Sequence, residues 1–507
     1  MRRGRSGQAP LKAAAPTGRM DFFMRRIHVI LLCLFVLVFL IGYLEPRPSL
    51  SDFEAARDGE FRATWDKRVH LAYWEKWASF EAEACQAMVD DFNRGQDEIF
   101  VHYIRTSQVN RKAMLAILGN DPPDVVGLWN NDVPQFGAGE ALMPLDDLMQ
   151  KSGLTSDYYI PNYLELCRYK GKTWALPTAP SSVGLFYNKE HFRAKEKELR
   201  AAGCDPDRAP ATIEELDRYA EVLSTFKADG SPLVMGFLAT EPGWFNHAWG
   251  YYFGGSLYDE ATGKVTTDDA ANIRAYTWLK RQAEIYGREK LLRFRSGFGT
   301  FDSPENAFIA GKVSMVMQGV WFPNFIRRHR PQMEFGVAPF PCAEGVPGPR
   351  SILETDVIGI PRGSKHPEAA WKFIYYVQTR GLSILCRLQG KHMPVSRPPV
   401  EFRQGHPNLE LEVFEKLSAS PHSFIMPRIT VWIEYQDEIR RAFEHVWNWP
   451  APEGALAGLS GDARRLKVEE LCRGEIERTL RAVRERMQEK LDRMAALDRL
   501  RDQREKR

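Results

Sequence analysis

Residues 69–104, VHLAYWEKWASFEAEACQAMVDDFNRGQDEIFVHYI, are the stretch that decides the fold. Its first residues, 69–73, predict a β-strand. Residues 80–94 predict a helix, because apolar side chains recur there at near-helical spacing. These side chains are Ala84, Met88, Val89 and Phe92. Residues 100–104 alternate as a second strand, so the stretch is a β-α-β unit.

The same alternation continues to about residue 449. A helix expected at 111–118 leads through the Asp121-Pro122-Pro123 turn into a strand at 124–128. Beyond it we expect a short helix at 142–149, a hairpin turn at 170–172, a strand at 184–187 and a helix at 212–226, capped by Thr212 with Glu215 three residues on. Helices and strands interleaved in this way predict α/β lobes with a mainly parallel sheet.

Length and composition are those of a globular protein. The chain has 507 residues, of which 44% are hydrophobic and 27% charged. At roughly 100 to 200 residues per domain, this length suggests two to four domains or one architecture made of two lobes. The net charge of +3 is nearly balanced, which argues against a nucleic-acid partner.

The N-terminal region predicts a membrane anchor. Residues 27–44 carry no charge and nearly span a hydrocarbon core at about 1.5 Å per residue. Arg and Lys residues dominate positions 1–26 against Asp21 alone, so this end is expected in the cytoplasm and the bulk on the periplasmic or extracellular side of the cell membrane. Residues 42–48 lack a small-x-small cleavage pattern. A single-pass signal anchor followed by a linker at 45–65 is therefore favoured over a removed signal peptide.

Motifs for metal binding and catalysis are absent from the sequence. Its seven cysteines include no CxxC pair and no metal-ligand spacing, and there is no GxSxG, HExxH or P-loop. We therefore expect no enzyme, no catalytic residues, no metal and no cofactor. An oxidising compartment would permit disulfides, but buried free thiols are the favoured state of most of the cysteines.

Several short motifs follow one another in a specific order. They are PDVV at 123–126, AGEALMPL at 138–145, YKGKTWALP at 169–177, LFYNK at 185–189, FIAGKVSM at 308–315, GVW at 319–321 and PEAAWKF at 367–373. Together they resemble extracellular solute-binding protein family 1, the sugar-binding proteins of ABC transporters that include the maltose-binding protein. The resemblance runs over residues 69–483.

This resemblance implies a two-lobed, periplasmic-binding-protein-like α/β fold with discontinuous lobes and a solute cleft between them. Lobe one would hold 66–178 and 353–395, lobe two 179–352 and 396–455, and a C-terminal helical tail 456–507. The chain would bind a small-molecule solute, a carbohydrate by analogy, and deliver it by lobe closure to ABC permease subunits with a separate ATPase.

Candidate binding residues follow from the chemistry of sugars and from the matched motifs. A pyranose stacks its C–H face on aromatic rings and offers hydroxyls to carboxylates and amides. By resemblance, Trp129 and Asp132 follow the PDVV strand at cleft positions. Trp74 and Trp77 follow the first strand, where cleft residues are also expected. The remaining candidates by resemblance are Glu241, Trp244, Trp321 and Trp432.

Each candidate also has a structural interpretation. The tryptophans could be core residues, which is the favoured reading for Trp432 and an even one for Trp74, Trp77 and Trp244. Asp132 could be a helix N-cap. Glu75, between Trp74 and Trp77, is expected to be solvated rather than a ligand-binding residue.

One candidate departs from the family pattern. Where the maltose-binding protein has a carboxylate four residues after a proline, this chain has Ser181. The pocket is therefore not expected to copy maltodextrin recognition. A different mono- or oligosaccharide, a polyol or a glycerophosphate-like solute remains open.

The C-terminal tail predicts an amphipathic helix. Its apolar residues, at three-four spacing, are Ile476, Leu480, Val483, Met487, Leu491, Met494 and Leu497. Up to Val483 it resembles the last helix of the family. Beyond that residue a frayed, solvated helix is favoured, with permease contact or dimerisation as the alternative.

Three other functions stay open at this stage. Without transport, the chain would be a ligand-binding sensor or scaffold. A glycoside-active enzyme would need paired carboxylates such as Asp132 and Glu241, although their matches are to binding positions on opposite lobes. A ferric-ion binder would use tyrosine pairs, but those at 158–159, 251–252 and 375–376 have the context of core helices and strand edges.

Overall fold

The β-α-β unit expected at 69–104 is present in the computed structural model, which describes residues 67–452 and 454–505. Strand β1 (Val69–Glu75), helix α4 (Ser79–Arg94) and strand β2 (Ile99–Arg105) follow one another, and the two strands pair in parallel. The apolar stripe of α4 is buried in one core with Leu71 and Tyr73 of β1, as its spacing predicted. The compact unit that these elements open extends from Val69 to the C-terminus.

Among the described residues, nine strands form one sheet that continues through both lobes. Its order is β2-β1-β3-β13-β6-β11-β8-β7, and β12 also pairs with β6. The strands not yet introduced are β3 (Val125–Trp129), β6 (Leu176–Asn188), β7 (Thr225–Phe226), β8 (Pro232–Phe237), β11 (Val313–Gly319), β12 (Phe335–Ala338) and β13 (Leu353–Gly359). Lobe one is the part built on β2, β1, β3 and β13, and lobe two is the part built on β11, β8, β7 and β12.

Strand β6 belongs to both lobes. Its residues 176–182 pair with β13, whereas residues 183–188 pair with β11 and β12. All of these pairings are antiparallel, as is that of β13 with β3, so the sheet is mixed rather than mainly parallel. The difference arises because β6 and β13 carry the chain out of lobe one and back into it, in opposite directions.

Helices cover both faces of the sheet in lobe one. Helices α4, α16 (Pro367–Tyr376) and α17 (Leu382–Leu388) pack on one face, and α5 (Val109–Leu118) and α6 (Val133–Ala138) on the other. The smaller elements here are α7 (Asp146–Lys151), α8 (Pro161–Glu165), β4 (Arg168–Tyr169) and β5 (Lys172–Thr173). The last two form the expected hairpin.

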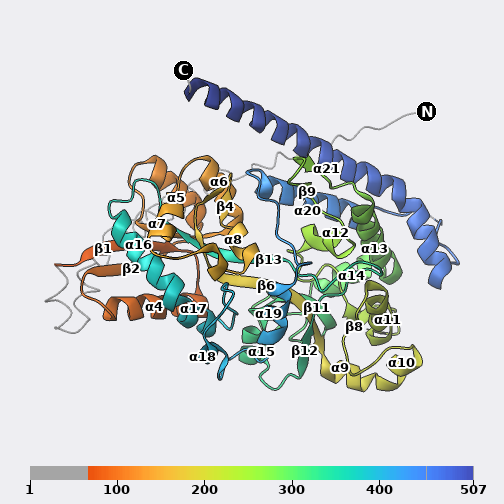
Figure 1. Cartoon of the computed structure of the whole chain (residues 1–507). Coiled ribbons are helices and arrows are strands. Elements are labelled where there is room, and N and C mark those ends of the chain that lie inside the picture. The colour runs from red at the N-terminus through yellow and green to blue at the C-terminus, as the bar shows by residue number, and fades with distance from the viewer. Residues whose placement is uncertain (1–66, 453, 506–507) are drawn as a thin grey trace, which may run out of the picture. The chain divides into compact units, whose positions relative to one another are not determined.

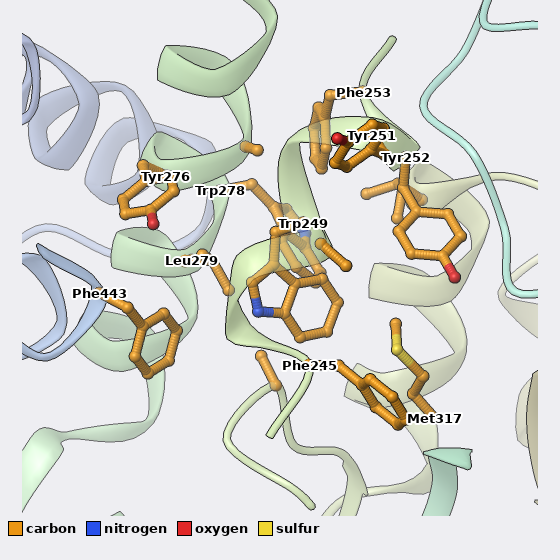
Figure 2. Packing of buried hydrophobic residues seen from close by; sticks show 14 of the residues in the cluster. Phe245, Trp249, Tyr251, Tyr252, Phe253, Tyr276, Trp278, Leu279, Met317 and Phe443 are labelled. Carbon is orange, nitrogen blue, oxygen red and sulfur yellow. The ribbon is translucent and has the colours of Figure 1, made fainter. Parts of the chain in front are cut away.

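Lobe two has the larger core. Trp249 packs there against Trp278, with Phe443 in the same cluster (Figure 2). Phe237 also packs edge-on against Trp249. The helices around this core are α11 (Ile213–Leu223), α12 (Trp249–Tyr252), α13 (Ala270–Tyr286) and α20 (Trp432–Asn448), while α15 (Phe322–His329) and α19 (Leu411–Ala419) cover the other face. Completing the lobe are α9 (Lys189–Ala194), α10 (Glu196–Ala201), α14 (Arg288–Arg295), α18 (Val400–Arg403), β9 (Tyr258–Asp259) and β10 (Lys264–Val265). Thr212 caps α11 as predicted, accepting a hydrogen bond from the Glu215 backbone N–H at 3.2 Å.

The C-terminal helix α21 (Gly461–Glu505) runs along α13 and α20 (Figure 1). It stays docked beyond Val483 as far as Met494, where the sequence had favoured a solvated helix. Met487 is buried in the lobe-two core, and Leu491 and Met494 pack against it. Gln488 also accepts a hydrogen bond from the Val265 backbone N–H at 2.9 Å. The apolar stripe therefore has a partner surface as far as Met494, whereas Leu497, the last residue of the predicted stripe, is 61% exposed.

The six described cysteines are free thiols, and all six are buried. Cys85, Cys167 and Cys386 lie in the cores of lobe one. Cys204, Cys342 and Cys472 lie in the core of lobe two.

The predicted anchor at 27–44 lies outside the described residues, as does the basic N-terminus before it. In the part of the chain that the structure describes, no helix is both long and apolar enough to cross a membrane.

Candidate functional site

A cavity of about 560 Å³ opens where the lobes meet at the crossing strands β6 and β13. Its walls come from both lobes and combine aromatic rings with polar and charged groups. The aromatic side chains are Trp77, Trp129, Trp244, Phe301, Trp321 and Phe325. The others are Glu81, Asn130, Asn131, Ala179, Ser181, Glu354, Thr355, Asp356 and Lys391.

Three of the aromatic residues present much of their surface to solvent, and one of them is Phe301, which is 39% exposed. Trp129, the last residue of β3, is 38% exposed, and Trp244 of lobe two is 41% exposed. Large rings left this open in a cavity are unusual for core residues and typical of a stacking surface. Trp321 follows β11 and folds back over Gly319, where a Cβ would lie 2.2 Å from its ring. Glycine is therefore required for that ring position.

Five of the nine candidates from the sequence line this cavity, and four do not. The five are Trp77, Trp129, Ser181, Trp244 and Trp321. Trp432 is buried in the lobe-two core, edge-on to His247 at 5.7 Å between ring centroids. Trp74 packs against the second core of lobe one. Glu241 instead forms an ion pair with Arg295 at 3.0 Å.

Asp132 acts behind the site rather than in it. Its side chain is 1% exposed and accepts hydrogen bonds from the Asn110 side chain at 3.0 Å and the Trp129 backbone N–H at 3.3 Å. Burial raises the pKa of its carboxyl group, and these two hydrogen bonds oppose the shift. Asp132 therefore holds the chain at the point where Trp129 enters the cavity. This positioning role is close to the helix N-cap role that the sequence left open for Asp132.

A buried network of charges forms one side of the cavity. The Lys76 ammonium lies 3.0 Å from Glu75 and 3.1 Å from Asp356, and also 4.8 Å from the ring centroid of Trp77. Lys391 lies 3.4 Å from Glu81 and 3.8 Å from the other oxygen of Asp356. Each of the two ammonium groups is therefore held between two carboxylates.

Glu75 corrects an expectation from the sequence. It is 2% exposed rather than solvated, and it also accepts a hydrogen bond from the Tyr73 hydroxyl at 2.7 Å. Its carboxylate lies over Gly127 of β3, where a Cβ would approach its Oε2 to 1.8 Å. Burial alone would lower the pKa of Lys76, but Asp356 and Glu75 outweigh burial and hold this pKa above its ordinary value.

Glu354 and Ser181 face each other across the two crossing strands. They are direct partners in the β13–β6 register, and both line the cavity. Ser181 is 7% exposed, and its hydroxyl has no hydrogen-bond partner among the described residues. Burial, together with the nearby Asp356, raises the pKa of Glu354 to about 7. The carboxylate that the sequence lacks at position 181 is thus supplied from the opposite strand.

Sequence reasoning missed Glu354, Asp356 and Lys391 because they return to the site from far along the chain. Glu354 and Asp356 lie in the gap between the motifs at 319–321 and 367–373, and Lys391 lies beyond the last motif. A signal was available in the sequence itself. Two acidic residues in the apolar run from Ile352 to Ile360 are costly in a buried strand unless they have a task.

Comparison with known proteins agrees with this architecture. The family model described as bacterial extracellular solute-binding protein matches residues 78–381. The maltotriose-binding protein of Pyrococcus abyssi is 22% identical over 318 residues, which cover 61% of this chain and 62% of that protein.

Solved structures share the fold. CpMnBP1 with mannobiose bound superposes with a TM-score of 0.65 at 24% identity, over 79% of this chain and all of the other. The sugar-binding protein MalE from Xanthomonas citri gives a TM-score of 0.61 at 19% identity, over 82% of this chain and 98% of the other.

The family match spans more than half of the chain and includes all seven motifs that first suggested the resemblance. The cavity between two α/β lobes is where such a protein would hold its solute. The chain therefore belongs to the bacterial extracellular solute-binding protein family.

Proposed function

We propose that this protein binds a sugar or a related polyhydroxylated solute in the cavity between its lobes and delivers it to the permease of an ABC importer. The observation that carries the proposal is the pairing of aromatic walls from both lobes with buried carboxylates and amides. Aromatic faces suit the apolar side of a pyranose, and the polar groups suit its hydroxyls. The names of the relatives, a maltotriose-binding protein and a mannobiose-bound protein, support the same solute class.

Binding would act through lobe closure. Trp77 and Trp129 lie on lobe one, whereas Trp244 and Trp321 lie on lobe two, so a solute that contacts all four favours the closed arrangement. No bond needs to be made or broken. The strands β6 and β13 connect the lobes and would bend during closure. We place the lobe limits at 66–178 with 353–395 and at 179–352 with 396–455.

The location and partners are part of the same proposal. Residues 27–44 would anchor the chain as a single-pass protein of the cell membrane, with the bulk on the periplasmic or extracellular side. The permease and its ATPase would be separate chains.

A thermal-shift screen of the full chain in mild detergent tests this proposal. The panel is sugars, polyols, glycerophosphates, amino acids and ferric salts, because a ligand of the native state raises stability by RT ln(1 + [L]/Kd). We expect a sugar-class solute to raise the melting temperature. Trp129→Ala and Trp321→Ala should abolish the shift, whereas Tyr375→Ala, an exposed aromatic residue on α16, should retain it. Stabilisation by iron or amino acids alone would refute the sugar proposal, and no stabilisation by any solute would favour a sensor or scaffold.

A further inference from the structure

The crossing strands leave a set of hydrogen-bond acceptors without donors in the cavity. The Glu354 carboxylate has no hydrogen-bond or ion-pair partner in the part of the chain that the structure describes. The Ser181 hydroxyl, directly opposite in the strand register, has none either. In the same cavity, the side-chain oxygen of Asn131 is buried without a donor. Buried polar groups are usually satisfied, so unsatisfied groups in a cavity wall point to a ligand.

The charges around these groups do not balance. Lys76 and Lys391 are already held by Glu75, Glu81 and Asp356. With Glu354, four carboxylates therefore stand against two ammonium groups, and neither ammonium group is paired with Glu354. Glu354 is partly buried in the cavity wall, where a carboxylate without a cation is costly, and a ligand that supplies the cation removes that cost.

Resting on the proposed function, we propose that Glu354, with Ser181, makes this cavity selective for a sugar that carries a protonated amino group. An ammonium group brings three N–H donors and one positive charge, whereas a hydroxyl brings one donor and no charge. The aromatic rings around the cavity also favour a cation over an anion. The same excess of negative charge disfavours glycerophosphate, which the sequence had left open.

Matched sugar pairs test the proposal by isothermal titration calorimetry on the full chain in detergent at pH 7.5. The pairs are glucosamine with glucose, mannosamine with mannose, galactosamine with galactose, and fully deacetylated chitobiose with cellobiose; the last pair differs in two amino groups and each of the others in one. We expect the amino member of at least one pair to bind about tenfold more tightly, or better, than its neutral member. Equal or tighter binding of the neutral member in every pair that binds would overturn the inference.

Variants connect the selectivity to its residue. Glu354→Gln keeps the size of the side chain and removes its charge, and it should bring the two members of a pair to equal affinity. Glu289→Gln removes an exposed carboxylate of α14 and should keep the preference. Ser181→Ala should weaken the amino sugar more than its neutral partner, and thermal melts of each variant without ligand establish that it is folded. A preference that survives Glu354→Gln would refute the assignment to this residue.

The outcomes separate the two proposals. If neutral sugars bind as well as amino sugars, the inference fails and the sugar-binding function stands. If no sugar of either kind and no polyol binds, or if only a glycerophosphate binds, both fail.

Discussion

Lys76 is an ionised side chain that lobe one holds almost out of contact with water. Its side chain is 2% exposed, and its ammonium joins Glu75 to Asp356, which come from strands β1 and β13. We expect Lys76→Met to cost about 3–5 kcal/mol of unfolding free energy, because Glu75 would be left buried without a cation and Asp356 would keep only Lys391, at 3.8 Å. Urea denaturation measures this. Lys372→Met, which removes an exposed ion pair with Glu98, should cost less than about 1 kcal/mol. Equal losses of unfolding free energy in the two variants would mean that the buried ion pairs stabilise the protein no more than the exposed one.

Glu354 should make the stability of the ligand-free protein depend on pH. Its folded-state pKa of about 7 lies above the ordinary glutamate value, so the folded protein holds a proton that the unfolded chain releases. Stability from this group is fully present below about pH 4.5 and is lost as pH rises through about 7. We therefore expect Glu354→Gln to change the free energy of unfolding differently at the two pH values. At pH 8 the variant should be more stable, relative to the parent protein, by on the order of 2 kcal/mol than it is at pH 4.5. Thermal melts at the two pH values measure the difference, and an effect of equal size at both would contradict the assigned cause.

For single residues, the sequence predicted the aromatic residues of the cavity better than its charged residues. Trp129 and Trp321 could be placed because each lies beside a motif of the resemblance. Glu354 and Lys391 could not, because their place in the cavity depends on which strands cross between the lobes. Asp132 was assigned to the right neighbourhood but not to the cavity wall, since a carboxylate next to a binding residue can equally serve to position it.

Helix α21 provides a matched comparison within one element. Leu480 is fully buried against lobe two, whereas Leu497 is 61% exposed on the same helix. We expect Leu480→Ala to cost about 2–5 kcal/mol through the cavity that it leaves. Leu497→Ala should change stability by less than about 0.5 kcal/mol. Urea denaturation of both variants is the measurement, and a small loss for Leu480→Ala would mean that α21 is only loosely docked.

Element boundaries followed from the sequence where periodicity was strong and failed where proline interrupted it. Helix α4 was predicted within one residue. Strand β6 was expected only at 184–187 but begins at Leu176, in a segment where Pro177 and Pro180 disfavour a strand on local grounds. That half of β6 pairs with β13 alone, so its other edge needs no N–H donor there. Whether prolines are tolerated in this strand depends on which strand pairs with it, and the local sequence does not reveal that partner.

Closure of the whole molecule should be visible in the fluorescence of its tryptophans. Trp129 and Trp244 lie on opposite walls of the cavity and are among its most exposed rings. If a solute brings the walls together, both rings lose contact with water. We expect the sugar that gives the largest thermal shift to reduce acrylamide quenching and to move the emission to shorter wavelength. The double variant Trp129→Phe with Trp244→Phe should lose most of this change, and unaltered quenching in the parent protein despite binding would argue against closure.

The two-lobed architecture was predictable as a whole because the motifs are spread over the chain in order, and their order reflects the topology. The mixed sheet was not, because strand direction depends on how the chain passes between the lobes. Local alternation of helix and strand carries no information about that passage.

Three of the six described buried thiols lie in each lobe, so transient unfolding of the two lobes can be followed separately. Cys85, Cys167 and Cys386 belong to lobe one, and the other three belong to lobe two. A buried thiol reacts with an alkylating reagent only when its surroundings open, so the rate of labelling at each site reports the free energy of that opening. Mass spectrometry of the labelled peptides would therefore tell whether the lobes unfold together or one before the other, without a single engineered probe.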